Sequence, residues 1–117
     1  MLLEDLVRAL LRYDSLAARQ WIADAARANV DWRQFPEPTG LDPVARVVAA
    51  GIVEMLASRA GSAAPPWTAK IGAAAEPILL VRAARRMPNL RRLCETEGPE
   101  PLRSRGVLAP PDFLTAA

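Results

Sequence analysis

Asp42–Gly61, DPVARVVAAGIVEMLASRAG, is the stretch of this chain with the clearest helical pattern. An aspartate followed by a proline is a typical helix start, because the carboxylate caps the first turn and proline fits the first helical position. Gly61 is expected to end the helix. The spacing predicts one buried face, formed by Val44, Val47, Val48, Gly51, Ile52, Met55 and Leu56. A glycine on that face, Gly51, predicts that a neighbouring helix approaches closely there.

Two more helices are predicted before this one. The first has an apolar stripe with helical spacing, made of Leu3, Leu6, Val7, Leu10 and Leu11. Asp14-Ser15 then predicts a cap and a restart, with a second helix over 15–28. The residues of that helix that are expected to face inward are Ala18, Trp21, Ile22 and Ala25. One continuous helix over 2–28 is the alternative. Residues 29–41 are expected to form a loop with one short turn around 32–35.

Prolines and glycines divide the C-terminal half. Residues 62–76 are expected to form a loop, with a stiff extended Pro65-Pro66-Trp67 inside it. Ile78–Val81 fits either a strand or a buried helical turn. The continuation into Arg86 favours a helix over 78–86, because no convincing partner strand is visible. A helix over 90–97 ends at Gly98, and a short helix is expected around 101–105.

These elements predict an all-α fold with four to six helices. Alanine is the commonest residue and aromatic residues are few, which favours helix over sheet. The helical domain covers residues 1–106, and a Pro-rich extended tail covers 107–117. The tail carries apolar side chains between prolines, namely Val107, Leu108, Phe113 and Leu114. Because such side chains are costly to leave in water, they pack either on this domain or, as an extended segment, on a partner.

Several function classes are excluded by what the 117 residues lack. There is no histidine, the commonest metal ligand and the side chain that titrates near neutral pH. Histidine-dependent triads and HExxH zinc sites are therefore excluded. Cys94, the one cysteine, is expected to be a buried inert thiol on the apolar stripe of its helix. Neither common glycine-rich phosphate motif is present. We expect no catalytic residues, metal, cofactor or small-molecule substrate.

The residues near the N-terminus indicate where in the cell the protein is expected. Glu4 and Asp5 are unsuited to a signal peptide, and no apolar run approaches the roughly 18 residues that span a bilayer. The expected location is the cytoplasm, with no membrane partner.

Positive charge collects near the C-terminal end. The net charge is only +2, but residues 82–105 hold seven arginines against three glutamates. Guanidinium groups bind carboxylates and phosphates bidentately, so this group is a candidate partner-binding surface. The alternative is a solvated helix face that Glu95, Glu97 and Glu100 partly neutralise. The candidates are Arg82, Arg85, Arg86, Arg91, Arg92, Arg103 and Arg105.

The candidate partner-binding residues also include apolar side chains. Trp21, Trp32, Phe35 and Trp67 could offer a stacking surface for bases, although a core position for Trp21, with the others pinning loops, is the simpler interpretation. Trp67, which follows two prolines, is a candidate interface anchor. Phe113 and Leu114 of the tail complete the set of predicted partner-binding residues.

Two stretches carry a resemblance to a known group: LLRYDSLAARQWIADAAR at 10–27 and EGPEPLRSRGVLAPPDFLTAA at 97–117. Together they resemble small actinobacterial proteins that are encoded beside nucleotidyltransferase-like toxins in toxin–antitoxin loci. The resemblance covers about a third of the chain and includes no catalytic signature. It implies an antitoxin that neutralises its toxin by direct binding. Such toxins add nucleotides to transfer RNA, using acidic residues that hold magnesium, and the arginines would cover that acidic pocket.

Two other functions stay open. A DNA-binding regulator would use residues 14–35 as a helix-turn-helix arm, although residues 1–60 carry seven arginines against eight acids, which disfavours phosphate contact. A non-catalytic accessory or scaffold subunit of another complex is the second alternative.

Overall fold

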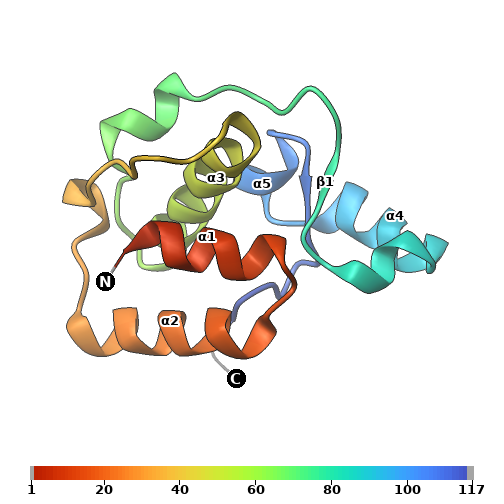
Figure 1. Cartoon of the computed structure of the whole chain (residues 1–117), viewed down its shortest axis with the longest axis horizontal. Coiled ribbons are helices and arrows are strands. Elements are labelled where there is room, and N and C mark those ends of the chain that lie inside the picture. Colours follow the sequence, from red (N-terminus) through yellow and green to blue (C-terminus); the bar gives the residue numbers. More distant parts are fainter. Residues whose placement is uncertain (1, 116–117) are drawn as a thin grey trace.

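The structure is a computed structural model that describes residues 2–115 of the chain. It is mostly helical (Figure 1). In chain order its elements are α1 (Leu3–Leu11), α2 (Ser15–Ala28), the 3₁₀ turn η1 (Trp32–Gln34), α3 (Pro43–Arg59), η2 (Pro66–Lys70), β1 (Ile78–Leu79), η3 (Arg82–Arg85), α4 (Pro88–Glu97), α5 (Glu100–Arg103) and β2 (Val107–Leu108). Among these, no helix combines the length and the apolar composition that crossing a bilayer requires.

Helix α3 is the centre of the fold. Asp42 caps it as predicted, because its carboxylate accepts the Ala45 N–H at 2.8 Å. Between positions 45 and 57 only Arg46 and Glu54 are not buried, so α3 is covered on nearly all sides rather than along one stripe. Val44, predicted to face inward, is 48% exposed because it lies on the first turn, beyond the packed neighbours. A helix that is apolar all round is typical of a core position.

Gly51 is where another helix meets α3 most closely, as predicted. That helix is α5: a Cβ at position 51 would lie 2.7 Å from Leu102 Cδ2 and 3.2 Å from the Pro101 carbonyl oxygen. The absence of a side chain at Gly51 therefore lets α5 pack directly on the α3 backbone.

The break between α1 and α2 confirms the predicted restart, and the continuous helix is wrong. Tyr13 adopts a left-handed φ of 60°, and the N–H of Asp14 donates to the Ala9 carbonyl at 2.8 Å. This is the Schellman helix end, whose left-handed position usually holds glycine. Asp14 then caps α2 by accepting the Ala17 N–H at 3.0 Å. The chain reverses, and α1 packs between α2 and α3 (Figure 1).

The aromatic side chains lie in the core. Trp21, Trp32 and Phe35 form a cluster with ring centroids 5.4–6.4 Å apart. Trp67 is only 8% exposed, and its indole N–H donates to the Phe35 carbonyl at 2.8 Å. These rings hold the two long loops against α3, and they offer no stacking surface. Trp67 is therefore not the interface anchor that its position after two prolines suggested.

The predicted helix over 78–86 is wrong. Ile78 and Leu79 form strand β1, which pairs in parallel with Val107 and Leu108 of β2. The Leu80 N–H donates to the Leu108 carbonyl at 3.0 Å, and only Arg82–Arg85 then forms a 3₁₀ turn. The partner strand comes from the segment expected to be an extended tail, which sequence periodicity could not reveal.

The C-terminal segment belongs to the core over its first residues. Val107, Leu108 and Ala109 are buried, so this part of the predicted 107–117 tail packs on its own domain. Phe113 and Leu114 are half-buried. The last two tail positions, 116–117, lie outside the described residues. Within the described residues, the fold is thus a helical domain with a two-stranded parallel sheet, in which β2 joins the C-terminal segment to β1.

Candidate protein-binding surface

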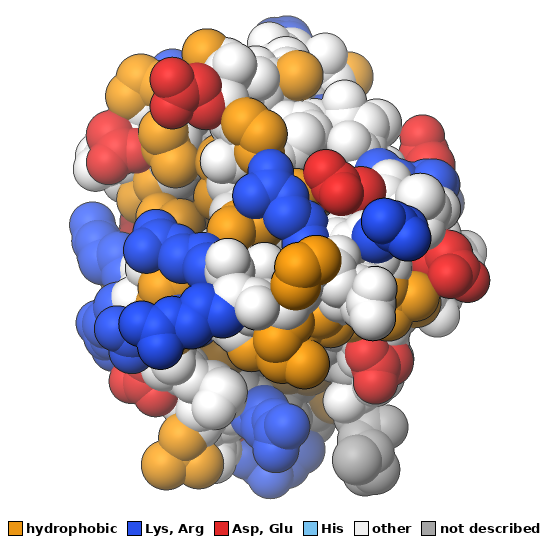
Figure 2. All heavy atoms as spheres, turned by 90° about the vertical axis from the view of Figure 1, so that its right-hand side faces the viewer, with side chains coloured by type: hydrophobic (Ala, Val, Ile, Leu, Met, Phe, Trp, Pro, Cys, Tyr) orange, Lys and Arg blue, Asp and Glu red, His pale blue; other side chains and the backbone are white. Residues whose placement is uncertain are grey.

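Five of the predicted arginines come from η3, its C-terminal cap and the adjoining helix α4, here called the arginine surface: Arg82, Arg85, Arg86, Arg91 and Arg92. Pro88 begins α4, where its missing N–H costs nothing. Beneath the surface, Ala84 and Cys94 are buried and anchor the two elements. Figure 2 shows this side of the molecule, with Lys and Arg side chains gathered beside hydrophobic ones.

The arginine surface is largely free of neutralising partners. Arg91 pairs with Glu95 at 3.6 Å, one turn further along α4. Within residues 2–115, Arg82, Arg85, Arg86 and Arg92 form no ion pair and are not buried. The interpretation as a face neutralised by glutamates therefore holds for Arg91 alone. Four unpaired guanidinium groups are available to a partner.

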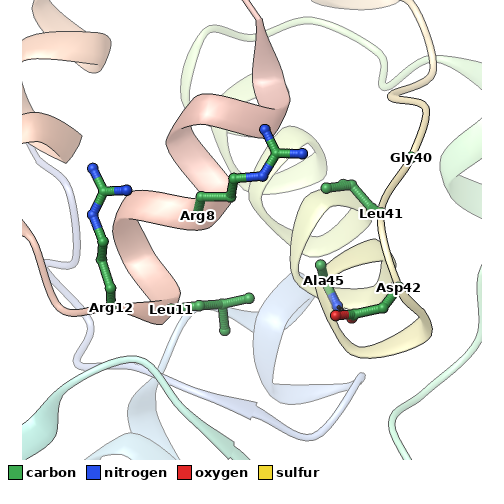
Figure 3. A pocket seen from close by; sticks show the side chains of 7 residues that line it. All are labelled: Arg8, Leu11, Arg12, Gly40, Leu41, Asp42 and Ala45. Carbon is green, nitrogen blue, oxygen red and sulfur yellow. Dashed lines mark hydrogen bonds between the residues drawn. The ribbon is translucent and has the colours of Figure 1, made fainter.

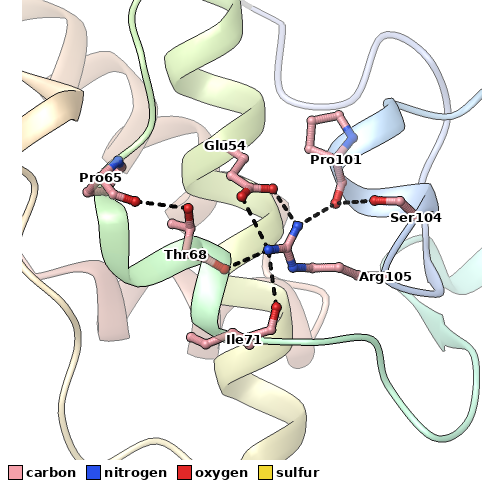
Figure 4. A network of polar contacts seen from close by, with 7 residues as sticks. All are labelled: Glu54, Pro65, Thr68, Ile71, Pro101, Ser104 and Arg105. Carbon is pink, nitrogen blue, oxygen red and sulfur yellow. Dashed lines mark hydrogen bonds and ion pairs between the residues drawn. The ribbon is translucent and has the colours of Figure 1, made fainter.

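Arg105 is not part of that surface. Its side chain is only 11% exposed and forms a bidentate ion pair with Glu54 of α3 (Figure 4). It also donates to the carbonyls of Thr68 at 2.7 Å and Ile71 at 3.2 Å. Arg105 therefore joins η2 and the chain after α5 to the central helix. Glu54 is the partner that sequence reasoning missed.

Arg103 and Cys94 both lie outside the arginine surface, and each has a separate structural setting. Arg103 is exposed on α5, and its guanidinium donates to the Thr96 carbonyl at 2.8 Å, near the carboxyl end of α4, where cations are favoured. Cys94 is fully buried, and burial raises the pKa of its thiol, which agrees with the predicted inert state.

A groove of about 910 Å³ brings together three of the predicted residues, Arg82, Phe113 and Leu114. One wall is α2, and the other is formed by Leu80–Arg82 and the C-terminal segment 110–115. Arg59 of α3 holds that segment by donating to the carbonyls of Phe113 and Pro111. Burial lowers the pKa of Arg59, an effect that nearby Asp112 opposes. Sequence reasoning missed this groove because its two walls lie far apart in the chain.

Tyr13 connects the groove to the arginine surface. Its hydroxyl donates to the Leu79 carbonyl at 3.3 Å, and the Arg82 guanidinium lies over its ring, 5.8 Å from the centroid. A cation over an aromatic face is an attractive arrangement. Arg82 is thereby positioned where the arginine surface meets the rim of the groove.

A second, smaller cavity of about 320 Å³ lies between α1 and the start of α3 (Figure 3). Leu11 and Leu41 point into it, and Arg8 reaches across toward Leu41. The Asp42 carboxylate is occupied with capping α3, while Arg12 points away and pairs with Asp14 at 3.4 Å. This cavity is therefore a packing gap between two helices rather than a built site.

Asp14 makes the groove wall sensitive to acid. Its pKa lies below the ordinary value because the carboxylate accepts the Ala17 N–H, with a smaller contribution from Arg12. The ionised carboxylate therefore stabilises the fold above the unfolded pKa, and this stabilisation is lost as the pH falls through the folded pKa. We expect an NMR titration to give an Asp14 midpoint below that of Asp in an unfolded peptide. In Asp14→Asn the start of α2 should lose this pH dependence, and an unshifted Asp14 midpoint would contradict the cap.

No protein-family model, no curated protein and no solved structure matches the chain. Within residues 2–115, no group of three or more Cys, Asp or Glu side chains is placed to hold a metal ion.

Proposed function

We propose that this chain is a non-catalytic antitoxin that binds a nucleotidyltransferase-like toxin in the cytoplasm and covers its acidic active-site pocket with the arginine surface. The observation that carries the proposal is the set of four guanidinium groups that are not buried and have no ion pair in the described part of the chain. The sequence resemblance at 10–27 and 97–117 indicates the class of partner protein, a nucleotidyltransferase-like toxin.

The chemistry of the two surfaces is complementary. A pocket that holds magnesium through carboxylates is negatively charged once the metal is absent, and guanidinium groups bind carboxylates through two parallel hydrogen bonds. Opposite charges also speed the encounter of the two proteins. A toxin covered in this way cannot admit the phosphates of transfer RNA, so binding alone is sufficient for neutralisation.

DNA binding is less well supported. A helix-turn-helix needs a second helix after α2 that can enter the major groove. Here α2 is followed by η1, a three-residue turn whose Trp32 is buried. Residues 14–35 therefore lack a recognition helix, and this is a correction to the helix-turn-helix interpretation.

The first experiment is co-expression with the protein encoded by the adjacent reading frame. If that neighbour stops growth alone and is harmless in a co-eluting complex, the antitoxin proposal is supported. A stable complex with a harmless neighbour would favour the accessory-subunit alternative instead. A harmless neighbour that does not bind would overturn the proposal, and the arginine surface should then be tested against duplex DNA over a range of salt concentrations.

The double reversal Arg85→Glu/Arg86→Glu is expected to weaken the toxin complex by more than about tenfold, or about 1.4 kcal/mol. Both side chains are exposed and make no side-chain hydrogen bond or ion pair in residues 2–115, so the variant should fold. Isothermal titration calorimetry measures the change.

The matched control is Arg33→Glu/Arg46→Glu. These two arginines are also exposed and without an ion pair in the described chain, but they lie on η1 and α3. The control changes the net charge equally and should leave the affinity within about twofold at moderate salt, because distant charges are screened. Equal losses in both variants would show a net-charge effect and remove the arginine surface from the proposal.

A further inference from the structure

The groove beside α2 presents apolar side chains that the fold does not fully cover. Ile22 on α2 and Phe113 and Leu114 on the opposite wall are half-buried, while Ala23 and Ala26 are exposed along α2. The small alanine side chains leave space for another backbone to approach α2. With a volume of about 910 Å³, the groove is large enough for several side chains of a second chain.

The charges around the groove specify the chemistry of an occupant. Arg19 and Arg82 line it, are accessible to solvent and have no ion pair within residues 2–115. Of the two lining carboxylates, Asp14 caps α2 and pairs with Arg12, whereas Asp112 is exposed and forms no ion pair within residues 2–115. The groove therefore has two lining arginines without an ion pair against one such carboxylate, and carboxylates of an occupant placed at Arg19 and Arg82 complement it.

Strained backbone marks both walls. Tyr13 and Leu114 adopt left-handed φ values of 60° and 57°, which side chains larger than glycine rarely adopt. Tyr13 thereby places its ring beneath Arg82, and Leu114 lines the groove from the opposite side. At Tyr13 this conformation also ends α1, and it fixes the direction of the side chain that contacts Arg82.

We propose that this groove binds an amphipathic helix of a partner protein, with an apolar stripe against Ile22, Phe113 and Leu114 and carboxylates toward Arg19 and Arg82. The inference rests on the proposed function for the identity of the partner, since the toxin is the protein expected to supply the helix. Helix-in-groove recognition needs an apolar channel of this kind and a few placed charges.

The test uses the full chain alone with a synthetic peptide. The probe is a fluorescent helical peptide as long as α2, with leucine along one face and glutamate elsewhere. The comparison peptide has lysine in place of every glutamate. We expect the acidic peptide to bind in the micromolar range, at least about tenfold more tightly than the basic one. Amide NMR shifts should change along α2 and residues 110–115.

Two matched variants locate the binding. Ala23→Glu places a bulky negative side chain in the groove, whereas Ala28→Glu makes the same change on the same helix outside the groove lining. Both positions are exposed, so both variants should fold. Ala23→Glu should weaken binding of the acidic peptide about tenfold or more, and Ala28→Glu should leave it unchanged.

The outcomes separate this inference from the proposed function. No binding of the acidic peptide, equal binding of both peptides, or equal effects of the two variants would overturn the groove proposal, whatever the neighbouring protein does. A neighbouring protein that fails to bind overturns the antitoxin proposal while peptide binding stands. If the neighbour binds, Ala23→Glu should weaken that complex as well.

Discussion

Arg105→Ala is expected to lower the free energy of unfolding by about 3 kcal/mol or more, because removing one member of a buried ion pair leaves the other charge uncompensated. The guanidinium pairs with Glu54 on α3 and donates hydrogen bonds to the carbonyls of Thr68 and Ile71, which follow α3 in the chain. Alanine leaves these acceptors without their donor in a region that water enters poorly. Glu54 keeps 23% of its side chain exposed, so its charge is partly solvated and the loss falls at the lower end of the range for buried pairs.

Urea unfolding followed by circular dichroism measures the Arg105→Ala effect. Arg86→Ala, a truncation of an exposed arginine without an ion pair in the described residues, is the control and should change stability by less than about 0.5 kcal/mol. If Arg105→Ala costs no more than this control, the pair is not structural. Glu54→Leu/Arg105→Met should recover much of the loss, since an apolar pair carries no uncompensated charge.

Leu102→Ala should destabilise the fold by about 2–5 kcal/mol, the usual range for a fully buried leucine. Leu102 is completely buried, and its side chain lies over Gly51 at the contact between α5 and α3. Because the backbones meet closely there, the neighbouring elements can relax only partly into the space that the deleted atoms leave. Thermal and urea unfolding measure the loss.

Gly51→Ala completes a double-mutant cycle with Leu102→Ala. Alone, the new methyl group meets the Leu102 side chain and the Pro101 carbonyl, which offsets the gain of up to about 1 kcal/mol in helix propensity. In the Leu102→Ala background the closest contact, with Leu102 Cδ2, is removed, and the contact with the Pro101 carbonyl remains. The double variant should therefore be more stable than the sum of the single effects predicts, by about 0.5–3 kcal/mol. Strict additivity would show that residues 51 and 102 do not share one packing site.

The starts of α2 and α3 were predictable because their causes are local, in contrast to the predicted helix over 78–86. Asp14 and Asp42 cap the helices that follow them, and each cap depends on residues within one turn. The contact at Gly51 was also predictable, since glycine weakens a helix and its place on an apolar stripe is typical of a close helix contact. The partner helix was not predictable, because nothing near Gly51 in the sequence refers to α5.

The candidate site was predictable only in part. A cluster of arginines in sequence indicates a cationic surface, and five of the seven come from η3, its C-terminal cap and α4, which packs against it. Arg105 has the same side chain as its neighbours in that cluster but is buried. Its position depends on Glu54, a residue 51 positions away, so no local pattern distinguishes it.

Local sequence patterns were enough to predict α1, α2 and α3, the caps that Asp14 and Asp42 provide, and the concentration of positive charge, because each depends on side chains within a few positions of one another. Tertiary structure alone decided that Ile78–Leu79 is a strand, that Val107–Leu108 is its partner, and that α2 and residues 110–115 face each other across a groove. The physical reason is that strand pairing, charge burial and groove formation are contacts between distant residues. Their free energies arise only when packing around α3 brings those residues together.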